Sequence, residues 1–328
     1  MIECYIESFK KGDVNKHIES QRWWVRDKKP VVETNIGWIE TYVDPLGVRA
    51  TYEGFVALTD KEKSRKFNTL VENSETLISA LPWDKDFEKN VFTSPDFTAL
   101  DVVCFSSNGC PIGINIPNYQ EVKETDGFKN VSLSNAYPKF SAENLFFCNE
   151  KDIEILTQVG QQSYVMHVAC HELLGHGTGK IFKKNEKGEF NFDIDFLINP
   201  LTNEKISSWY EENENFESKF TDISRSLEEL RADLGGLYFT FFKEVHQIFE
   251  FNENLYKDII YSIWLVFIRK AVLGLNLYND EVKRWGQAHT QGAWIFVQYL
   301  LENQVEGQEI LTINLEEDKK NFTINLNK

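Results

Sequence analysis

The sequence predicts a fold of the α+β class that is mainly helical and has a smaller β-rich and irregular part. Apolar residues recur at helical spacing in residues 60–80 and in several segments between residues 153 and 303. Residues 31–56 are instead rich in β-branched and aromatic side chains, which favours strands. Because the two kinds of segment interleave along the chain, we expect two lobes, each built from discontinuous stretches.

The composition is that of an ordinary folded protein and excludes several classes. The 328 residues suffice for one large domain or two modest ones. The net charge of −16 argues against a protein that binds the nucleic-acid backbone. The five cysteines are odd in number and lack a Cys-x-x-Cys spacing, which indicates reduced thiols. The N-terminus shows no secretory pattern, and the apolar run 261–268 is too short to span a bilayer, so we expect a cytoplasmic protein with no membrane partner.

The first 140 residues divide into four predicted segments. These are a short charged helix, a strand pair with a turn at 44–47, a helix, and loop-rich chain with short strands, over residues 1–30, 31–56, 60–80 and 81–135. Loops held on a scaffold often carry binding groups. The fourth segment is therefore a candidate binding region, although a plain irregular connection fits its composition equally well.

The second half is predicted to be largely helical. Helical spacing returns near residue 153 and continues to residue 176, and residues 183–220 then form a polar excursion over the surface. Three further helices, the last two separated near residues 278–280, and a terminal hairpin are predicted over residues 222–250, 254–303 and 310–326.

The central feature of the sequence is the stretch from His171 to His176, which reads His-Glu-Leu-Leu-Gly-His. It is similar to the helical zinc motif His-Glu-x-x-His but has one residue more. Residues at i and i+5 lie about 140° apart around a regular helix, so the two imidazoles could bind one metal only if the helix widens. A π-bulge has this effect, and Gly175 is the inserted residue. We therefore predict a π-bulge at residues 173–175.

A third ligand is needed for a catalytic zinc site with an open position. Glu229 is the best candidate, because Asp233 lies four residues later on the same helix face, where its carboxylate could orient a ligand histidine. Glu228 could do the same. Zn²⁺ held by His171, His176 and Glu229 would lower the pKa of water toward about 7. Glu172 would then act as the general base in the hydrolysis of an amide.

Plainer interpretations remain open at this point. A helix can carry His-Glu-x-x-x-His by chance, and the run 228–231 alone is typical of a solvated helix face. The occurrence of both favours the metal site. His167 lies four residues before His171 and is better spaced for a regular helix, but that pairing leaves Glu172 without a second histidine, so we interpret His167 as a packed or solvent-facing residue. His289 could be a core histidine.

With both motifs in view, the chain resembles the dipeptidyl peptidase III family of zinc exopeptidases. The family signatures are His-Glu-x-x-Gly-His and Glu-Glu-x-Arg-Ala-(Glu/Asp), matched here at residues 171–176 and 228–233. The resemblance implies one catalytic unit with a helical zinc lobe and a partial β-containing lobe across a cleft. The zinc lobe would comprise residues 54–91 and 141–307, the β lobe residues 1–53 and 92–140. The hairpin-like tail, 308–328, lies outside the resemblance.

The resemblance also implies roles for the site residues. It assigns one Zn²⁺ per chain to His171, His176 and Glu229, with Glu172 as the base and Glu228 and Asp233 as the groups that orient the histidines. His289 would hydrogen-bond near the scissile carbonyl. The peptide's amino terminus and first residues would be held by Glu33, Asn115 and Asn118. The implied function is the hydrolysis of dipeptides from the N-terminus of oligopeptides.

The chain departs from the family in three respects. Family members are roughly twice as long, a tyrosine is expected where this chain has Asn35, and an arginine is expected where it has Ala293. Loss of a transition-state donor such as that tyrosine costs a few kcal/mol. The alternative function is therefore a catalytically weak zinc-binding fragment or binding module that needs a partner chain for the missing lobe. An ordinary zinc endopeptidase is disfavoured by Gly175 and by the 228–233 motif.

Overall fold

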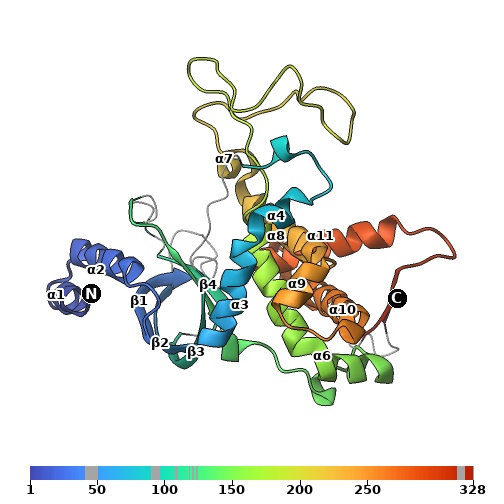
Figure 1. Cartoon of the computed structure of the whole chain (residues 1–328), viewed down its shortest axis with the longest axis horizontal. Coiled ribbons are helices and arrows are strands. Elements are labelled where there is room, and N and C mark those ends of the chain that lie inside the picture. The colour runs from blue at the N-terminus through green and yellow to red at the C-terminus, as the bar shows by residue number, and fades with distance from the viewer. Residues whose placement is uncertain are drawn as a thin grey trace.

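The computed structural model describes residues 1–40, 51–89, 97–107, 110–117, 119, 122, 125–315 and 322–327. For residues 38–40, 51 and 115 it describes the backbone alone. The predicted turn at 44–47 lies outside the described residues, as does Asn118. Figure 1 shows a sheet with two flanking helices on the left and a larger helical part on the right.

The N-terminal region contains two helices, α1 (Ile2–Lys11) and α2 (Val14–Arg26), where the sequence analysis predicted one. Gly12 ends α1 in the left-handed conformation with φ of 66°. Asp13 then begins α2, because its side chain accepts hydrogen bonds from the backbone N–H groups of Asn15 and Lys16. The two adjacent caps explain why the helical segment is divided.

A five-stranded sheet forms the core of the smaller part. Its strands are β1 (Val32–Glu40), β2 (Thr51–Thr59), β3 (Phe97–Ser106), β4 (Gly113–Ile116) and β5 (Lys129–Leu133), in the order β1-β2-β3-β5-β4. β3 and β5 are parallel and the other neighbours antiparallel. Trp24 and Val25 of α2 are buried in the cluster that covers one sheet face, together with Phe55, Leu100 and Leu133.

The segment predicted as one helix over residues 60–80 consists of α3 (Lys61–Glu72) and α4 (Ser74–Ser79). Apolar residues at helical spacing in this segment are buried, namely Phe67, Leu70, Leu77 and Ile78. The ring of Phe67 contacts Phe97 of β3 with centroids 4.8 Å apart. α3 therefore joins the sheet to the helical part.

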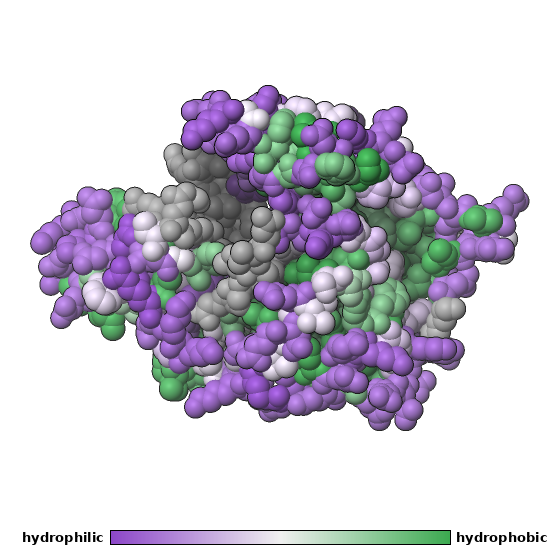
Figure 2. Space-filling model, turned by 45° about the horizontal axis from the view of Figure 1, so that its top comes forward, coloured by the Kyte–Doolittle hydropathy of each residue, from purple (hydrophilic) through white to green (hydrophobic). Residues whose placement is uncertain are grey.

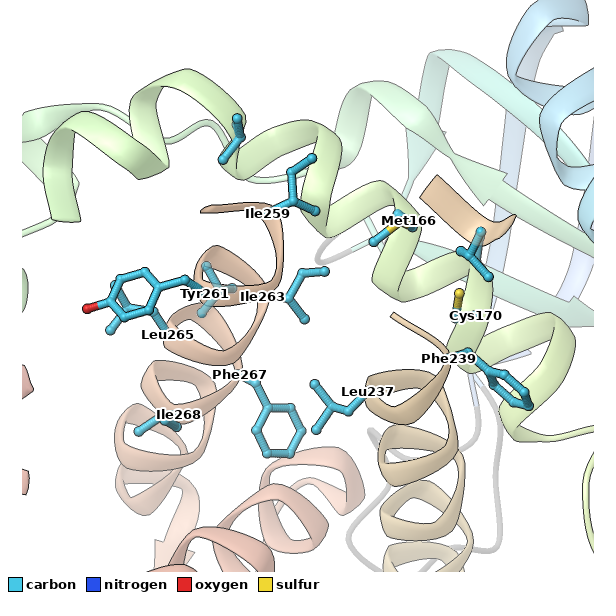
Figure 3. Close-up of a cluster of buried hydrophobic side chains, with 14 of the residues drawn as sticks. Met166, Cys170, Leu237, Phe239, Ile259, Tyr261, Ile263, Leu265, Phe267 and Ile268 are labelled. Atoms are coloured by element: carbon cyan, nitrogen blue, oxygen red, sulfur yellow. The ribbon is translucent and has the colours of Figure 1, made fainter. Parts of the chain in front are cut away.

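The helical part is built around α6 (Glu150–Ala169), α8 (Ser224–Phe239) and α10 (Tyr256–Gly274), with α11 (Ala288–Glu302) packed against α8 and α10. Figure 3 shows how Met166, Leu237 and Ile263 from the first three helices point into one apolar core. The remaining helical and strand elements are η1 (Lys85–Phe87), η2 (Ser134–Ala136), η3 (Ala142–Asn144), η4 (Cys170–Gly175), α7 (Phe216–Phe220), η5 (Thr221–Ile223), α9 (Lys243–Ile248), η6 (Glu253–Leu255), η7 (Leu275–Leu277), β6 (Tyr278–Asn279) and β7 (Arg284–Trp285).

The predicted terminal hairpin is present as β8 (Leu311–Leu315) and β9 (Phe322–Leu326). Leu311, Phe322 and Ile324 are buried in the same core as the helices, and Ile324 donates its backbone N–H to Phe147 O at 3.1 Å. Most of the surface seen in Figure 2 is hydrophilic, as expected for a net charge of −16. In the part of the chain that the structure describes, no helix combines the length and apolarity needed to cross a membrane.

Candidate metal centre

The chain from Cys170 to Gly175 forms a π-helix, η4, which continues directly from α6. His176 donates its backbone N–H to His171 O at 3.0 Å, five residues earlier, instead of to the residue four before it. The imidazole rings of His171 and His176 consequently lie 4.8 Å apart between centroids and nearly perpendicular. The prediction of a widened helix that brings both histidines together is confirmed.

Small residues, Gly175 of η4 and Ala232 and Gly236 of α8, let the two helices lie against each other. A Cβ at Gly175 would stand 2.3 Å from Ala232 O, which no side chain can tolerate. A Cβ at Gly236 would stand 3.0 Å from the backbone nitrogen of His171. This close contact places the 228–233 segment beside the two histidines.

Glu229 of α8 points its carboxylate at the imidazoles. Its Oε2 lies 3.2 Å from His171 Nε2, 3.6 Å from His176 Nε2 and 3.2 Å from His289 Nε2. Within the described residues this buried oxygen meets the geometry of no hydrogen bond. Three imidazole nitrogens thus surround a buried carboxylate oxygen that accepts no hydrogen bond from the part of the chain that is described. Such a group of donor atoms is the arrangement expected of a cation-binding position.

The outward-facing nitrogens of the two motif histidines are each held by a carboxylate. His171 Nδ1 lies 2.9 Å from Asp233 Oδ1, and His176 Nδ1 lies 2.8 Å from Glu228 Oε1. Such contacts fix the ring orientation and direct Nε2 toward the ligand position. Both carboxylates occupy the places that the sequence analysis expected of groups orienting the histidines.

These contacts shift the pKa values of the groups involved. Burial alone would lower the pKa of His171, but the neighbouring carboxylates, Asp233 above all, raise it to about 10. Burial opposes ionisation of Glu228, yet hydrogen bonds from His176 and Arg231 lower its pKa to about 2. The pKa of Glu229 is also lowered, because three imidazoles outweigh the effect of its burial. The site thus favours positive charge at its centre.

Two cations complete the cluster, and the sequence analysis assigned neither of them a role. Lys270 Nζ lies 2.7 Å from Asp233 Oδ2, and Arg231 donates to both carboxylate oxygens of Glu228, at 2.5 and 3.0 Å. Arg231 stands inside the second motif, so its proximity could have been inferred. Lys270 comes from α10, where no local pattern distinguishes it.

The charge balance of the cluster suits a divalent cation. Four carboxylates, those of Glu172, Glu228, Glu229 and Asp233, stand against the two cations and leave two negative charges when the histidines are neutral. Ligand atoms of His171, Glu172 and His176, and likewise of His171, Glu229 and His289, lie within 4.8 Å of one another. The residues present therefore fit a bound metal ion on geometry, charge and donor type.

Glu172 and His289 lie beside the centre, whereas His167 is packed in the interior. Glu172 is 28% exposed and lies 4.0 Å from His171 Nε2, where it can reach a water at the centre. His289, at the start of α11, has its Nδ1 2.9 Å from Gln287 Nε2, and its ring faces that of His171. His167 is buried, and burial lowers its pKa to about 3. His167 is therefore packed, in agreement with one of the two interpretations from the sequence.

Of the residues expected to hold the substrate's amino terminus, Glu33 and Asn115 belong to the sheet and not to the histidine–carboxylate cluster. Glu33 is 2% exposed and accepts hydrogen bonds from Lys129 Nζ at 2.9 Å and Trp24 Nε1 at 2.6 Å. Asn115 belongs to β4, the outermost strand of the sheet beside β5, and its side chain is not described. A Cβ at Gly113, two residues earlier, would stand 3.9 Å from Glu172 Oε1, so β4 passes next to the candidate centre.

The two departures noted in the sequence are both buried. Asn35 is 1% exposed and donates through Nδ2 to Gln21 Oε1 of α2 at 2.8 Å. Ala293 lies within the helical core.

Fold and site together define the class: an α+β protein whose histidine–carboxylate cluster, on a π-bulged helix, is of the kind found in metallopeptidases. The chain belongs to Peptidase family M49, whose model matches residues 1–328. This match includes the tail hairpin, which we expected to lie outside the resemblance.

The curated relatives that the chain matches are named dipeptidyl peptidase 3. The chain is 44% identical to the protein of Nematostella vectensis over its whole length and 45% identical to those of Rattus norvegicus and Homo sapiens over 95% of its length. It spans less than half of these relatives, from 42% to 45%.

Among solved structures, that of DPP III from Caldithrix abyssi matches 98% of the chain with a TM-score of 0.68 and 20% identity. That of dipeptidyl-peptidase III from Corallococcus sp. strain EGB matches 96% with a TM-score of 0.62 and 18% identity. The chain covers 53% and 51% of those chains, so their fold is shared over about half of its extent.

Proposed function

We propose that this chain is a zinc-dependent dipeptidyl peptidase that releases dipeptides from the N-terminus of oligopeptides. The observation that carries the proposal is the convergence of His171 Nε2 and His176 Nε2 on Glu229 Oε2, at 3.2 and 3.6 Å. Membership of Peptidase family M49 and the name of the curated relatives support the substrate class. The proposed location is the cytoplasm, where the five free thiols would stay reduced.

In this proposal His171, His176 and Glu229 hold one Zn²⁺. A zinc ion supplies Lewis acidity, which lowers the pKa of water toward about 7 and polarises a peptide carbonyl. Asp233 and Glu228 hold the imidazoles by their Nδ1 atoms. Glu172 takes the proton of the attacking water and returns it to the leaving amine. His289, half-buried beside Glu229, hydrogen-bonds near the scissile carbonyl.

Substrate binding is proposed to involve Glu33, Asn115 and Asn118, as the resemblance implies. β4 supports a path for the peptide, because this outermost strand passes Glu172 at Gly113 and carries Asn115 two residues further on. Glu33 is already paired with Lys129 beside Trp24 of α2, so an α-ammonium group could reach it only if Lys129 moved aside.

A second candidate is a zinc-binding protein with weak hydrolysis that needs a partner chain for full activity. The buried position of Asn35 favours it, because a side chain that donates to Gln21 cannot polarise a substrate carbonyl. The Glu33–Lys129 pair favours it as well. The two candidates share the metal and differ in turnover.

The proposal is tested by metal analysis together with dipeptide release from dipeptidyl reporter substrates. We expect one zinc per chain and chelator-sensitive release. Glu172→Gln should keep the zinc and lose roughly 10²- to 10⁴-fold in rate, the contribution of a general base. Exposed Glu75→Gln on α4 serves as the control and should match the wild type. Zinc-loaded protein whose slow release is unchanged by Glu172→Gln would favour the second candidate.

A further inference from the structure

Three groups from three different helices contact one another in a row on the Nδ1 side of His171. His171 of η4 is 2.9 Å from Asp233 Oδ1 of α8, and Asp233 Oδ2 is 2.7 Å from Lys270 Nζ of α10. The ammonium group also lies 4.8 Å from the centre of the Phe267 ring, one turn earlier on α10. Each carboxylate oxygen of Asp233 therefore has its own partner, the imidazole on one side and the ammonium on the other.

Burial makes the outer partner important. The Asp233 side chain is 2% exposed, so bulk water cannot orient its carboxylate, whereas Lys270 reaches solvent with 29% of its side chain exposed. A carboxylate with only one fixed oxygen can turn about its Cβ–Cγ bond. With both oxygens fixed, Oδ1 keeps its direction toward His171 Nδ1.

The same arrangement recurs behind the second motif histidine. Glu228 Oε1 holds His176 Nδ1 at 2.8 Å, and Arg231 donates to Oε1 and Oε2 of Glu228 at 2.5 and 3.0 Å. The two sets of contacts use different carboxylates of α8, and their cations come from different helices, Lys270 from α10 and Arg231 from α8. Their common order of imidazole, carboxylate and cation indicates a shared purpose at the centre that both histidines face.

We propose that Lys270 is a positioning residue of the metal centre. It fixes Asp233 Oδ2, and Asp233 in turn holds His171 with Nε2 directed at the ligand position beside Glu229. This inference rests on the proposed metal site and adds to it a residue that lies outside both motifs. A purely structural role, in which the ion pair only fastens α8 to α10, would affect unfolding but not metal affinity.

The experiment compares three substitutions at Lys270 with a matched control. Lys270→Met removes the cation, Lys270→Gln keeps a hydrogen-bond donor without charge, and Lys270→Arg restores both. The control is Lys66→Met on α3, which breaks the Lys66–Glu250 pair of 3.0 Å, an ion pair that includes no residue of the cluster. The measurements are the zinc dissociation constant by chelator competition, the visible spectrum of the cobalt-substituted protein, and urea unfolding without metal.

We expect Lys270→Met to weaken zinc binding roughly tenfold, the low end of the 10- to 100-fold loss typical for changes outside the ligand set. Its cobalt spectrum should shift, while Lys270→Arg and Lys66→Met should remain within about threefold of the wild type. Lys270→Gln should lie between them. If Lys270→Met unfolds, the graded comparison of the Gln and Arg variants carries the test.

Wild-type zinc affinity and spectra in every folded Lys270 variant would overturn the inference and leave the metal site intact. A wild-type protein that binds no zinc would instead refute the proposed function itself. The two failures are therefore distinguishable.

Discussion

At the scale of single residues, His289 is placed where it could act either as a metal ligand or as a hydrogen-bond donor to the substrate. Its Nε2 lies 3.2 Å from Glu229 Oε2, the same distance as His171 Nε2, so distance alone would admit it as a ligand. His171 and His176 differ from it in having a carboxylate on Nδ1, whereas His289 Nδ1 faces the Gln287 amide. An imidazole backed by a carboxylate is the better metal ligand.

We therefore expect His289→Ala to keep one zinc per chain and to lose activity. A lost transition-state donor costs roughly 10²- to 10³-fold in rate. His176→Ala, the matched change at a proposed ligand, should lose zinc. The measurements are metal content after dialysis and dipeptide release. Zinc lost from the His289 variant and kept in the His176 variant would reverse the two assignments.

The residues that the sequence could identify are those with local spacing as a signal. His171, Glu172, His176 and the 228–233 segment stand in two short motifs, and the structure brings them together. Lys270 gave no such signal, because it stands 37 positions after Asp233 and its place depends on how α10 crosses α8. Pairing of Glu33 with Lys129 was equally hidden, since the two residues are 96 positions apart and lie on β1 and β5, which are not neighbours in the sheet.

At the scale of elements, the π-helix depends on Gly175. Here a Cβ would meet Ala232 O at 2.3 Å, so η4 and α8 could not keep their contact. We expect Gly175→Ala to lower the free energy of unfolding of the metal-free protein by about 1–3 kcal/mol, as overpacking does, and to weaken zinc binding.

The measurements are urea unfolding and zinc titration. Gly113→Ala is the control for stability, because its added carbon would meet nothing closer than 3.5 Å. Equal unfolding curves for the two variants would contradict the close contact between Gly175 and Ala232.

Asp126, three residues before β5, forms ion pairs with two arginines of α2. Its Oδ1 accepts from Arg26 Nε at 2.8 Å and its Oδ2 accepts from Arg22. The Thr125 hydroxyl and the two arginines together hold the pKa of Asp126 below its usual range. A depressed carboxyl pKa stabilises the fold above the unfolded-state pKa of about 3.9, and this contribution disappears as the pH falls through the folded-state pKa.

Asp126→Asn should therefore be less stable than the wild type at pH 7 and at pH 5, with a difference that shrinks toward zero below about pH 3.9. Urea unfolding of the metal-free protein at several pH values measures it. Exposed Asp101→Asn, 51% exposed in the wild type, should change stability by less than about 0.5 kcal/mol at pH 7. A difference for the Asp126 variant that is constant with pH would rule out this linkage.

Helices and strands could be predicted from the sequence where their signal lies in a short stretch of residues. Two of these signals are local: the extra residue between the histidines predicted η4, and the apolar stripe predicted a helix over residues 60–80, which the structure divides into α3 and α4. The break between α1 and α2 was also local, at Gly12 and Asp13, but was not recognised. By contrast, the parallel pairing of β3 with β5 joins segments separated by loops, and no spacing along the chain encodes it.

At the scale of the whole molecule, the sheet part and the helical part share core residues. Residue 54, the predicted start of the helical lobe, falls inside β2, which pairs with β1 and β3 along its length. Phe97 and Ala99 of β3 are buried in the helical core. The alternation of strand-like and helical segments was visible in the sequence. The burial of β3 residues in the helical core was not, because it depends on how the sheet packs against the helices.

Metal binding should stabilise the whole chain, because the ligands come from η4 and α8, which meet only in the folded state. At a free zinc concentration about 100 times the dissociation constant, the gain is about 2.7 kcal/mol. For a chain of this size we expect the melting temperature to rise by roughly 3–6 °C. Thermal unfolding with zinc and with a chelator measures this, and His171→Ala should show no rise. Equal melting temperatures in the wild type would speak against the centre.

The two ends of the chain lie on different parts of the molecule: α1 flanks the sheet, and the β8–β9 hairpin is sealed into the helical core (Figure 1). Fluorescent donor and acceptor dyes attached near residues 2 and 327 would therefore report the separation of the sheet from the helices. Energy transfer between them would reveal whether the two parts approach each other when a peptide is added. It would do so without any label near Glu172.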